Sequence, residues 1–324
     1  MAAMKKRRPA SRRSAPAAPP TTKKEKMKNA IIYRTPKGWP ESAVRMSEAI
    51  KHLAFAPCHP SAPESFGFVL PAGHAEGFAH RIGSQIVLTL QTETKILPKS
   101  VVARAVADLA AKIEEREGRT IGRKERKELS EVVTADLLPR AFTTLSRISA
   151  YLFPDDGRLV IDTASQKKAN DFVEILLHIA PDNDIKPFQT NNRPADGMTE
   201  WLQGEAPDSL TIDDECTLVR DDDENPTVKY LHHSLDGEDI ADHLACGKRP
   251  TQLAVTCNDR ASFVITDKLH IKRFVLHDVV ALEIGEQETM ADRFDAEMAL
   301  HAGEMKIAID AIEEALGGPV REAA

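Results

Sequence analysis

The chain has 324 residues, of which 42% are hydrophobic, and this is enough to build the cores of about two average domains. The composition excludes a fully disordered chain and a small domain held together only by disulfides. The formal net charge is −7, but residues 1–26 carry nine basic side chains and one acid, a net +8, so the other 298 residues carry −15. The split predicts a basic tail on an acidic body, where any anion-binding surface must come from local clusters of Lys and Arg.

The two ends of the chain and the spacing of its cysteines indicate the cellular compartment of the protein. Residues 1–26 are rich in Pro, Ala, Ser and like charge, so we expect a disordered tail, with a flexible end at 321–324. A chain that starts at Met27 should therefore still fold. The tail lacks the apolar core of a secretory signal, no stretch approaches 18 apolar residues, and the four cysteines show no CxxC spacing. We predict a cytoplasmic protein with reduced thiols and no membrane partner.

The first half of the body shows short strand and helix patterns followed by a helical hairpin. We predict a strand at 29–34, a helix over about 41–53 and a buried strand at 85–92. Pro98 is placed in the first turn of the next helix, Gly118 ends that helix, and a second helix follows a short connector. The apolar stripes of the two helices are Val101, Val102, Ala105, Val106, Leu109 and Ile113, and then Leu129, Val132, Val133 and Leu137.

The second half of the body predicts mainly antiparallel strands and two more helices. In chain order these elements are strands at 141–153 and 158–162 joined by a PDDG turn, a helix at 166–179, meander strands at 252–257, 260–266 and 270–276, and a long helix whose apolar stripe runs from Phe294 to Leu316 before Gly317 and Gly318. Residues 182–242 hold 17 acids and four basic residues, and the borders of their short elements are not predicted.

Antiparallel hairpins outnumber βαβ units, so the pattern predicts the α+β class with mixed antiparallel sheets, a helical hairpin and a long C-terminal helix. We divide the body into an N-terminal α+β region, 27–180, and a C-terminal α+β region, 181–320. The basic helical hairpin, 98–140, belongs to the first of them.

Motifs of catalysis are missing or incomplete. The nearest approach to a phosphate-binding loop is 118–124 (GRTIGRK), whose glycines are one residue too close and which no Lys-Ser or Lys-Thr completes. A metal-dependent nuclease needs carboxylates that converge near a lysine, and Asp295 with Glu304 and Lys306 offers these residue types. Glu304 and Lys306 are two positions apart on a predicted helix, however, so their side chains point in different directions and cannot share one metal site. We therefore expect these residues to lie on a solvated helix face.

Two further polar groups also fall short of a metal site. The acidic run 221–224 lacks the alternating spacing of a calcium loop, which favours a bare surface turn. His232, His233 and His243 have no cysteine or acid at a spacing that completes a ligand set, which favours an ordinary loop. We therefore predict no catalytic residues, no metal and no cofactor.

Basic residues cluster in three places. Residues 95–147 hold 12 basic and eight acidic side chains, and cations crowd the first turn of the second hairpin helix, where the macrodipole disfavours them. Interspersed glutamates leave open the alternative of a salt-bridged surface hairpin. The second cluster is a Lys pair at the start of the 166–179 helix, behind a candidate N-cap at Ser165. The third is 248–273, with six basic and two acidic side chains.

These clusters predict binding of duplex DNA through its backbone, because duplex affinity comes mainly from Lys and Arg set against phosphates. An aromatic content of 5% gives little support for stacking on single strands. Separate basic clusters on an acidic body are more typical of an inner lining than of one flat face. The candidate DNA contacts are Arg119, Arg123, Lys124, Arg126, Lys167, Lys168, Arg260, Lys272 and Arg273.

Seven short segments in a fixed order make the chain resemble a known family. They are LAFAPC (53–58), KILP (95–98), LLPRAF (137–142), ASQKKA (164–169), MTEWL (198–202), RFDAEM (293–298) and EALGG (314–318). Together they resemble the RdgC recombination-associated proteins of bacteria over about residues 27–318. The resemblance implies a nucleoid-associated, non-catalytic DNA-binding protein whose curved protomers form a ring-shaped homodimer around duplex DNA of any sequence. It also implies that the protein restrains the RecA recombinase by competing with it on DNA.

The chain departs from the family pattern in two places. Family members begin near the equivalent of Met27, so residues 1–26 are either a lineage-specific basic arm or the product of an upstream start codon. Leu231 and His232 stand where the family can carry a basic pair. Two functions of other classes stay open as alternatives, a DNA-processing nuclease and a protein-only scaffold that acts on the recombinase.

Overall fold

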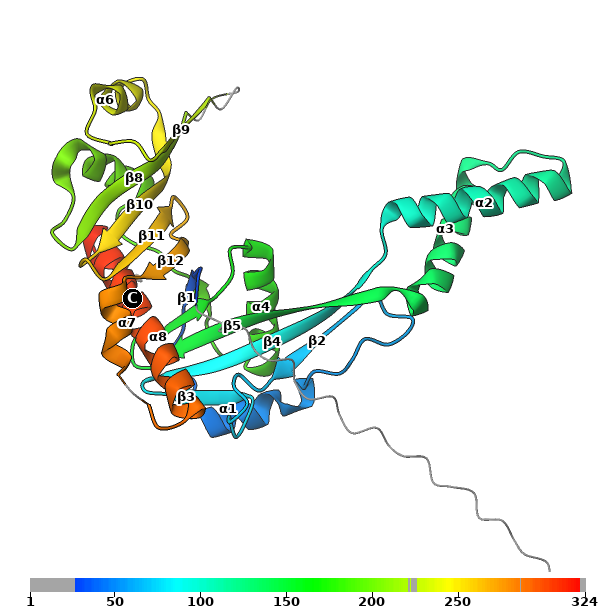
Figure 1. Ribbon diagram of the computed structural model, residues 1–324, viewed down its shortest axis with the longest axis horizontal. Coiled ribbons are helices and arrows are strands. Elements are labelled where there is room, and N and C mark those ends of the chain that lie inside the picture. The colour runs from blue at the N-terminus through cyan, green and yellow to red at the C-terminus, as the bar shows by residue number, and fades with distance from the viewer. Residues whose placement is uncertain (1–26, 221, 223–225, 286, 321–324) are drawn as a thin grey trace, which may run out of the picture.

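The computed structural model of the chain describes residues 27–220, 222, 226–285 and 287–320. The predicted disordered tail, 1–26, and flexible end, 321–324, lie outside this part, as do three of the four residues of the acidic run 221–224. The described residues form two antiparallel sheets and eight α-helices, so the predicted α+β class is confirmed (Figure 1).

The N-terminal sheet has seven strands, and all of its pairs are antiparallel. In chain order they are β1 (Ile31–Arg34), β2 (Glu64–Val69), β3 (Ala79–Ile82), β4 (Gln85–Ile96), β5 (Phe142–Phe153), β6 (Arg158–Ile161) and β7 (Lys186–Pro187). Their order across the sheet is β2-β4-β5-β6-β1-β7, and β3 pairs with the first residues of β4. The strands predicted in this region are present, and β4 runs on to Ile96 because it stays paired with β5 along its length.

Helices cover one face of this sheet. Helix α1 (Ala43–Ile50), the 3-10 turn η1 (Lys51–Leu53) and α4 (Gln166–Ile179) match the helices predicted at 41–53 and 166–179. Ser42 and Ser165 cap α1 and α4, each accepting a hydrogen bond from a backbone N–H of the first turn. Alternate residues such as Ile86 and Leu88 of β4 face these helices.

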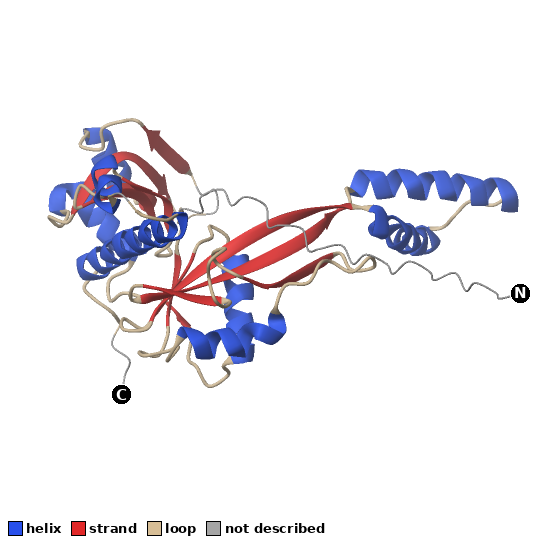
Figure 2. Ribbon diagram, turned by 60° about the horizontal axis from the view of Figure 1, so that its bottom comes forward, coloured by secondary structure: helices blue, strands red, loops and turns tan. Residues whose placement is uncertain are grey.

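The predicted helical hairpin connects β4 to β5 and lies at the far end of their long ribbon (Figures 1 and 2). It consists of α2 (Lys99–Glu117), α3 (Arg123–Leu137) and the 3-10 turn η2 (Leu138–Arg140). Gly118 ends α2 at a φ of 66°, which glycine adopts without a Cβ penalty. Pro98 precedes the helix as its N-cap rather than standing in the first turn, since its ψ of 136° is extended.

The apolar stripes of the hairpin are narrower than predicted. Val106 and Val133 are buried, but Val101 is 47% exposed and Val132 is 62% exposed. The physical reason is the position of the hairpin beyond the edge of the sheet. Two helices that pack mainly on each other bury one seam each, and the flanks of a wide stripe stay in solvent.

The C-terminal sheet has five strands in the order β12-β11-β10-β8-β9, all paired antiparallel. They are β8 (Leu210–Val219), β9 (Thr227–Leu231), β10 (Arg249–Cys257), β11 (Ala261–Thr266) and β12 (Ile271–Leu276), so the predicted meander is confirmed. The helical elements of this half are α5 (Pro194–Glu200), the π-helical turn η3 (Trp201–Glu205), α6 (Glu238–Ala245), α7 (Asp278–Ala281), the 3-10 turn η4 (Leu282–Ile284) and α8 (Met290–Ala315).

Helix α8 is the predicted long C-terminal helix, and it packs on both sheets. Its apolar side chains, among them Met305 and Ile309, share one buried cluster with Val87 and Tyr151 of the N-terminal sheet and with residues of the C-terminal sheet such as Val255. Gly317 and Gly318 follow the helix with φ values of 78° and 81°. The N-terminal sheet is therefore buried on both faces where it meets α8, which explains why the first seven residues of β4, 85–91, are all buried.

Polar contacts fix the same junction. Arg158 of β6 forms ion pairs with Asp310 and Glu313 of α8, and Arg34 of β1 donates to Glu313 over 2.7 Å. The segment before β1 continues as an extra pairing partner of β12, because Ala30 and Ile271 exchange two backbone hydrogen bonds of 2.8 and 2.9 Å. The two sheets are thus joined by backbone as well as by side chains.

The solvated helix face expected for Asp295, Glu304 and Lys306 is wrong. Only 5% of Glu304 is exposed, and its carboxylate accepts from Arg260. Lys306 is paired with Asp156 and Asp310, and Asp295 is half-buried. The reason is that α8 is covered by a sheet on more than one side, so polar residues between its apolar stripes also meet protein.

We expect burial to decide the cost of substitutions along α8. Ile309→Ala, at a position that is 1% exposed, should lower the free energy of unfolding by about 2–5 kcal/mol, because it leaves a cavity between the sheets. Ile307→Ala removes the same atoms from the same helix at a position that is 41% exposed, and should cost less than half as much. Urea unfolding of both variants measures the difference, and equal costs would contradict the packing described for α8.

Candidate nucleic-acid interface

The protomer has a concave outline with α4 inside it. In Figure 1 the C-terminal sheet and the helical hairpin stand at opposite ends of the N-terminal sheet, and α4 lies between them. We call residues 95–147 the arm and this concave region the inner side. A helix that starts on the inner side presents its first backbone N–H groups and any flanking cations there.

The arm holds three predicted contacts without an internal partner. Arg123, Lys124 and Arg126 occupy the first turn of α3, and all three are exposed. Within the described residues no carboxylate pairs with any of them, although Glu125 stands in the same turn. Cations at a helix N-terminus oppose the macrodipole, so an anion that binds here relieves an unfavourable arrangement.

Arg119 differs because it is held by two glutamates. Its guanidinium donates two hydrogen bonds of 2.7 Å to Glu125 and one of 2.9 Å to Glu117. These bonds raise the pKa of Arg119 and lower the pKa of Glu125, with Glu125 the larger cause for the arginine. The alternative of a salt-bridged surface hairpin therefore applies to Arg119. The neighbouring cations of α3 have no such partners in the described chain.

Lys167 and Lys168 lie in the first turn of α4, behind the N-cap Ser165 as predicted. Both are exposed, and neither has an ion-pair partner in the part of the chain that the structure describes. They line a groove between α4 and the face of β2, β4 and β5 at the base of the arm, together with Thr94 and Ser146. The groove is mixed in charge, because Glu64, Asp171 and Glu174 also line it.

The cluster in the C-terminal sheet is largely engaged in internal contacts. Arg260 donates to Glu283 over 2.8 and 2.9 Å and to the buried Glu304 over 2.6 and 2.9 Å, and these bonds raise its pKa. Arg273 lies in a β-bulge of β12 and donates to Glu215 over 2.6 Å. Lys272 is half-buried, with no carboxylate partner in the described residues.

Two large apolar side chains are exposed side by side where the arm begins. Ile96 and Phe142 are paired directly across β4 and β5, and they are 50% and 85% exposed. Because side chains alternate along a strand, they lie on the same face as Thr94 and Ser146, which line the groove beside α4. Neighbouring β2 adds the half-exposed Phe66 to this face. Exposed aromatic and branched side chains in register are typical of a surface that binds another molecule.

The rejected motifs have other structural roles. The two glycines of 118–124 end α2 and precede α3, so they shape a connector between helices. Glu304 and Lys306 bind different partners, as expected for positions two apart on a helix. His233 and His243 both pack near Tyr230 with tilted rings, whose centroids lie 5.4 and 6.2 Å from that of the tyrosine.

The fold also assembles one polar group that the sequence analysis did not predict. His74 and His80 lie next to Asp295, which is more than 200 residues away in the chain. Neither histidine belongs to a ligand spacing that could be found from the sequence, because the third residue comes from α8.

Comparison with known proteins identifies the family. A family model described as "Putative exonuclease, RdgC" matches residues 27–319. The chain belongs to the RdgC family. It is 38% identical over 293 residues to the recombination-associated protein RdgC of Cupriavidus necator, covering 90% of this chain and 98% of that one. The RdgC proteins of Dechloromonas aromatica and Bordetella pertussis are 37% and 33% identical, each over 91% of this chain and 99% of their own length.

The names of the RdgC relatives and the description of the family model differ on whether the proteins are enzymes. The curated relatives are named for an association with recombination, whereas the family model is described by an enzyme activity. Among the helices of the described residues, none combines the length and apolar character that crossing a bilayer requires.

We expect Arg260 to act mainly on stability. Arg260→Gln leaves the buried carboxylate of Glu304 without a cation, so it should lower the thermal unfolding midpoint clearly. Adding Glu304→Gln to this variant should recover part of the loss, because the uncompensated charge is then removed. Duplex affinity, measured at a temperature where both variants are folded, should change less than in Arg123→Gln. A larger loss of affinity than in Arg123→Gln would make Arg260 a direct DNA contact.

Proposed function

We propose that this RdgC-family chain binds double-stranded DNA without sequence preference, as a homodimer that encircles the duplex. By occupying DNA in this way it restrains the RecA recombinase in the nucleoid. The protein acts by binding, without catalytic residues or a cofactor. Contacts to phosphates fix the position of a protein on DNA but carry no sequence information, so charge sets the affinity.

The unpaired cations at the starts of α3 and α4 carry this proposal. Arg123, Lys124 and Arg126 in α3 and Lys167 and Lys168 in α4 have no carboxylate partner within the described residues, although the body is acidic. A phosphate can bind such a cation without first displacing an internal partner. Arg119, Arg260 and Arg273 would have to exchange a carboxylate for a phosphate, and Lys272 is half-buried. The five unpaired cations are therefore the main contacts that we propose.

The shape of the protomer and the exposed apolar residues of the arm support the homodimer. A concave protomer leaves its inner side open, so a closed ring needs a second copy related by two-fold symmetry. A two-fold interface joins the same surface of both copies, and exposed Ile96 and Phe142 offer apolar area that a second arm would bury. This arrangement keeps the cations of both protomers around one central space.

A nuclease is the second candidate, because the family model carries the description of an exonuclease. Strand cleavage gives shortened products, whereas binding leaves the strands intact, so one assay separates the two functions. A scaffold that acts on the recombinase alone is the third candidate, and it predicts no retention of DNA at all.

With labelled duplex and Mg²⁺, the protein should retard migration of the DNA and leave both strands at full length. Duplexes of unrelated sequence and equal length should be retained equally, because phosphates are the same in all of them. Light scattering of the free protein should give twice the mass of one chain. Shortened strands would favour the nuclease, and DNA that is not retained even at low salt would favour the scaffold. In the light-scattering experiment, the mass of a single chain would contradict the ring-shaped homodimer.

We also expect the arm to contribute a defined part of the salt dependence. The logarithm of affinity should fall linearly with the logarithm of salt, at about −0.9 per phosphate neutralised. The double variant Arg123→Gln with Arg126→Gln should weaken binding to all sequences alike and flatten this slope by about two units, if each arginine neutralises one phosphate. Titrations of fluorescent duplex at several salt concentrations measure the slope.

The matched control removes two charges from the opposite edge of the protomer. Arg45→Gln with Arg81→Gln changes exposed residues of α1 and β3, two elements at the lower edge of Figure 1. This variant should keep the slope of the unchanged protein. Equal flattening in the control and the arm variant would show that only total charge matters and would remove the arm from the interface.

A further inference from the structure

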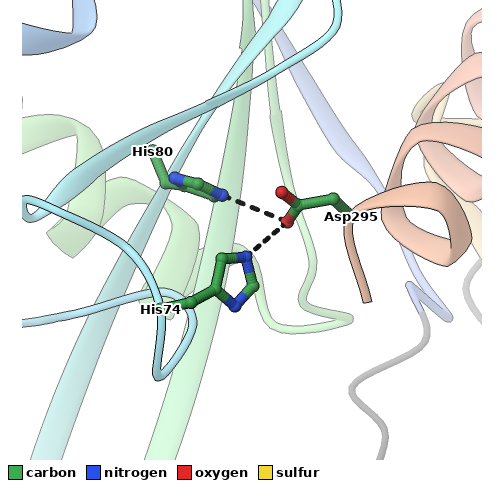
Figure 3. A group of neighbouring side chains, drawn as sticks. All are labelled: His74, His80 and Asp295. Carbon is green, nitrogen blue, oxygen red and sulfur yellow. Dashed lines mark hydrogen bonds and ion pairs between the residues drawn. The ribbon is translucent and has the colours of Figure 1, made fainter. Parts of the chain in front are cut away.

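Three side chains from distant parts of the chain meet at one point on the body, away from the arm. His74 comes from the loop between β2 and β3, His80 from β3, and Asp295 from the first turns of α8. Figure 3 shows both imidazole rings pointing at the same carboxylate. His74 Nε2 lies 2.9 Å and His80 Nε2 lies 3.1 Å from Asp295 Oδ1.

The surroundings hold these side chains in place. The two imidazole rings stand edge to face with centroids 5.2 Å apart, and His74 packs in the same way on Phe294, at 5.7 Å. The side chains of His74, His80 and Asp295 are 30%, 16% and 35% exposed, so the group is partly covered and still open to solvent. Rigid ligands with one open side allow an ion to enter without rearrangement of the fold.

The distances suit a small cation. Three ligand atoms, one from each residue, lie within 4.8 Å of one another. Two ligands bound to Zn²⁺ at 2.0–2.1 Å in tetrahedral geometry are about 3.3 Å apart. The observed N···O distances of 2.9 and 3.1 Å therefore need to widen by only a few tenths of an ångström. In the bound state each Nε2 lone pair faces the ion, and the ring proton moves to Nδ1, the other tautomer of neutral imidazole.

We propose that His74, His80 and Asp295 form a binding site for a divalent transition-metal ion of the Zn²⁺ class. Two imidazoles and one carboxylate are a donor set typical of Zn²⁺, Fe²⁺ and Ni²⁺, whereas Mg²⁺ and Ca²⁺ prefer oxygen ligands alone. Three protein ligands leave at least one coordination position for water. The sequence prediction of a chain without a metal is replaced by this proposal.

The ion acts as a clamp between the two halves of the protein. Its ligands tie β3, at the edge of the N-terminal sheet, to the start of α8, which packs on both sheets. An ion that binds only when β3 and α8 are in contact stabilises that contact by mass action. Metal binding should therefore raise the thermal unfolding midpoint of the whole body.

The experiment uses full-length protein without an affinity tag, stripped with a chelator and dialysed against Zn²⁺. We expect one ion per chain by elemental analysis and a higher thermal midpoint with Zn²⁺ than with Mg²⁺. Replacing Zn²⁺ by Co²⁺ should give visible d–d absorption bands that report coordination by nitrogen and oxygen. His74→Gln and Asp295→Asn, which keep the size and polarity of the side chains, should weaken Zn²⁺ binding at least about 100-fold and abolish the thermal shift.

The matched control is His232→Gln. His232 also stands beside a carboxylate, with its Nδ1 3.3 Å from Asp214, but among the described residues no third ligand completes a set there. The control should keep one ion per chain and the full thermal shift. Circular dichroism of the metal-free variants establishes that they are folded. The proposal is wrong if the protein without substitutions binds no Zn²⁺. It is also wrong if a folded His74→Gln variant still binds one ion with unchanged affinity. In either case the three side chains form only a hydrogen-bonded cluster.

Discussion

The burial of α8 against both sheets is the interaction on which the architecture depends. A sheet with two apolar faces is stable only if both are covered, and α1 and α4 cover just one face of the N-terminal sheet. Helix α8 covers the other face and at the same time fills the core of the C-terminal sheet. Ion pairs of Arg34 and Arg158 with its last turns fix the angle between the layers. Helix α8 thereby holds the C-terminal sheet at one end of the concave outline, while the long β4–β5 ribbon places the hairpin at the other.

The packing of α8 between the sheets also decides which charged side chains have partners inside the protein and which face solvent. Arg34, Arg158 and Arg260 lie beside α8, and each forms an ion pair with a carboxylate of that helix. The arm projects beyond the packed layers, and its cations have fewer acids within reach. A net-acidic protein can therefore offer a positive surface, because pairing is decided by the local fold and not by the total charge.

The sequence predicts what depends on neighbours in the chain and misses what depends on distant partners. Periodicity was sufficient for β4, for the hairpin helices and for α8. It failed for β8, because a bulge between Ile212 and Cys216 interrupts the alternation of buried residues and three consecutive residues of the strand, 213–215, are acidic. The candidate contacts in α3 and α4 could be proposed from charge alone. The ion-pair partner of Arg273 could not be predicted in this way, because Glu215 is 58 residues away in the chain.

The order in which the chain is made has consequences for a fold that closes with its last helix. Strand β1 emerges early but pairs with β6 and β7, and the sheet face with Val87 and Tyr151 is covered only when α8 has been synthesised. Until then a nascent chain exposes an apolar sheet surface to chaperones and to other chains. A message truncated before the codon for Met290 therefore yields an aggregation-prone product in place of a smaller folded protein.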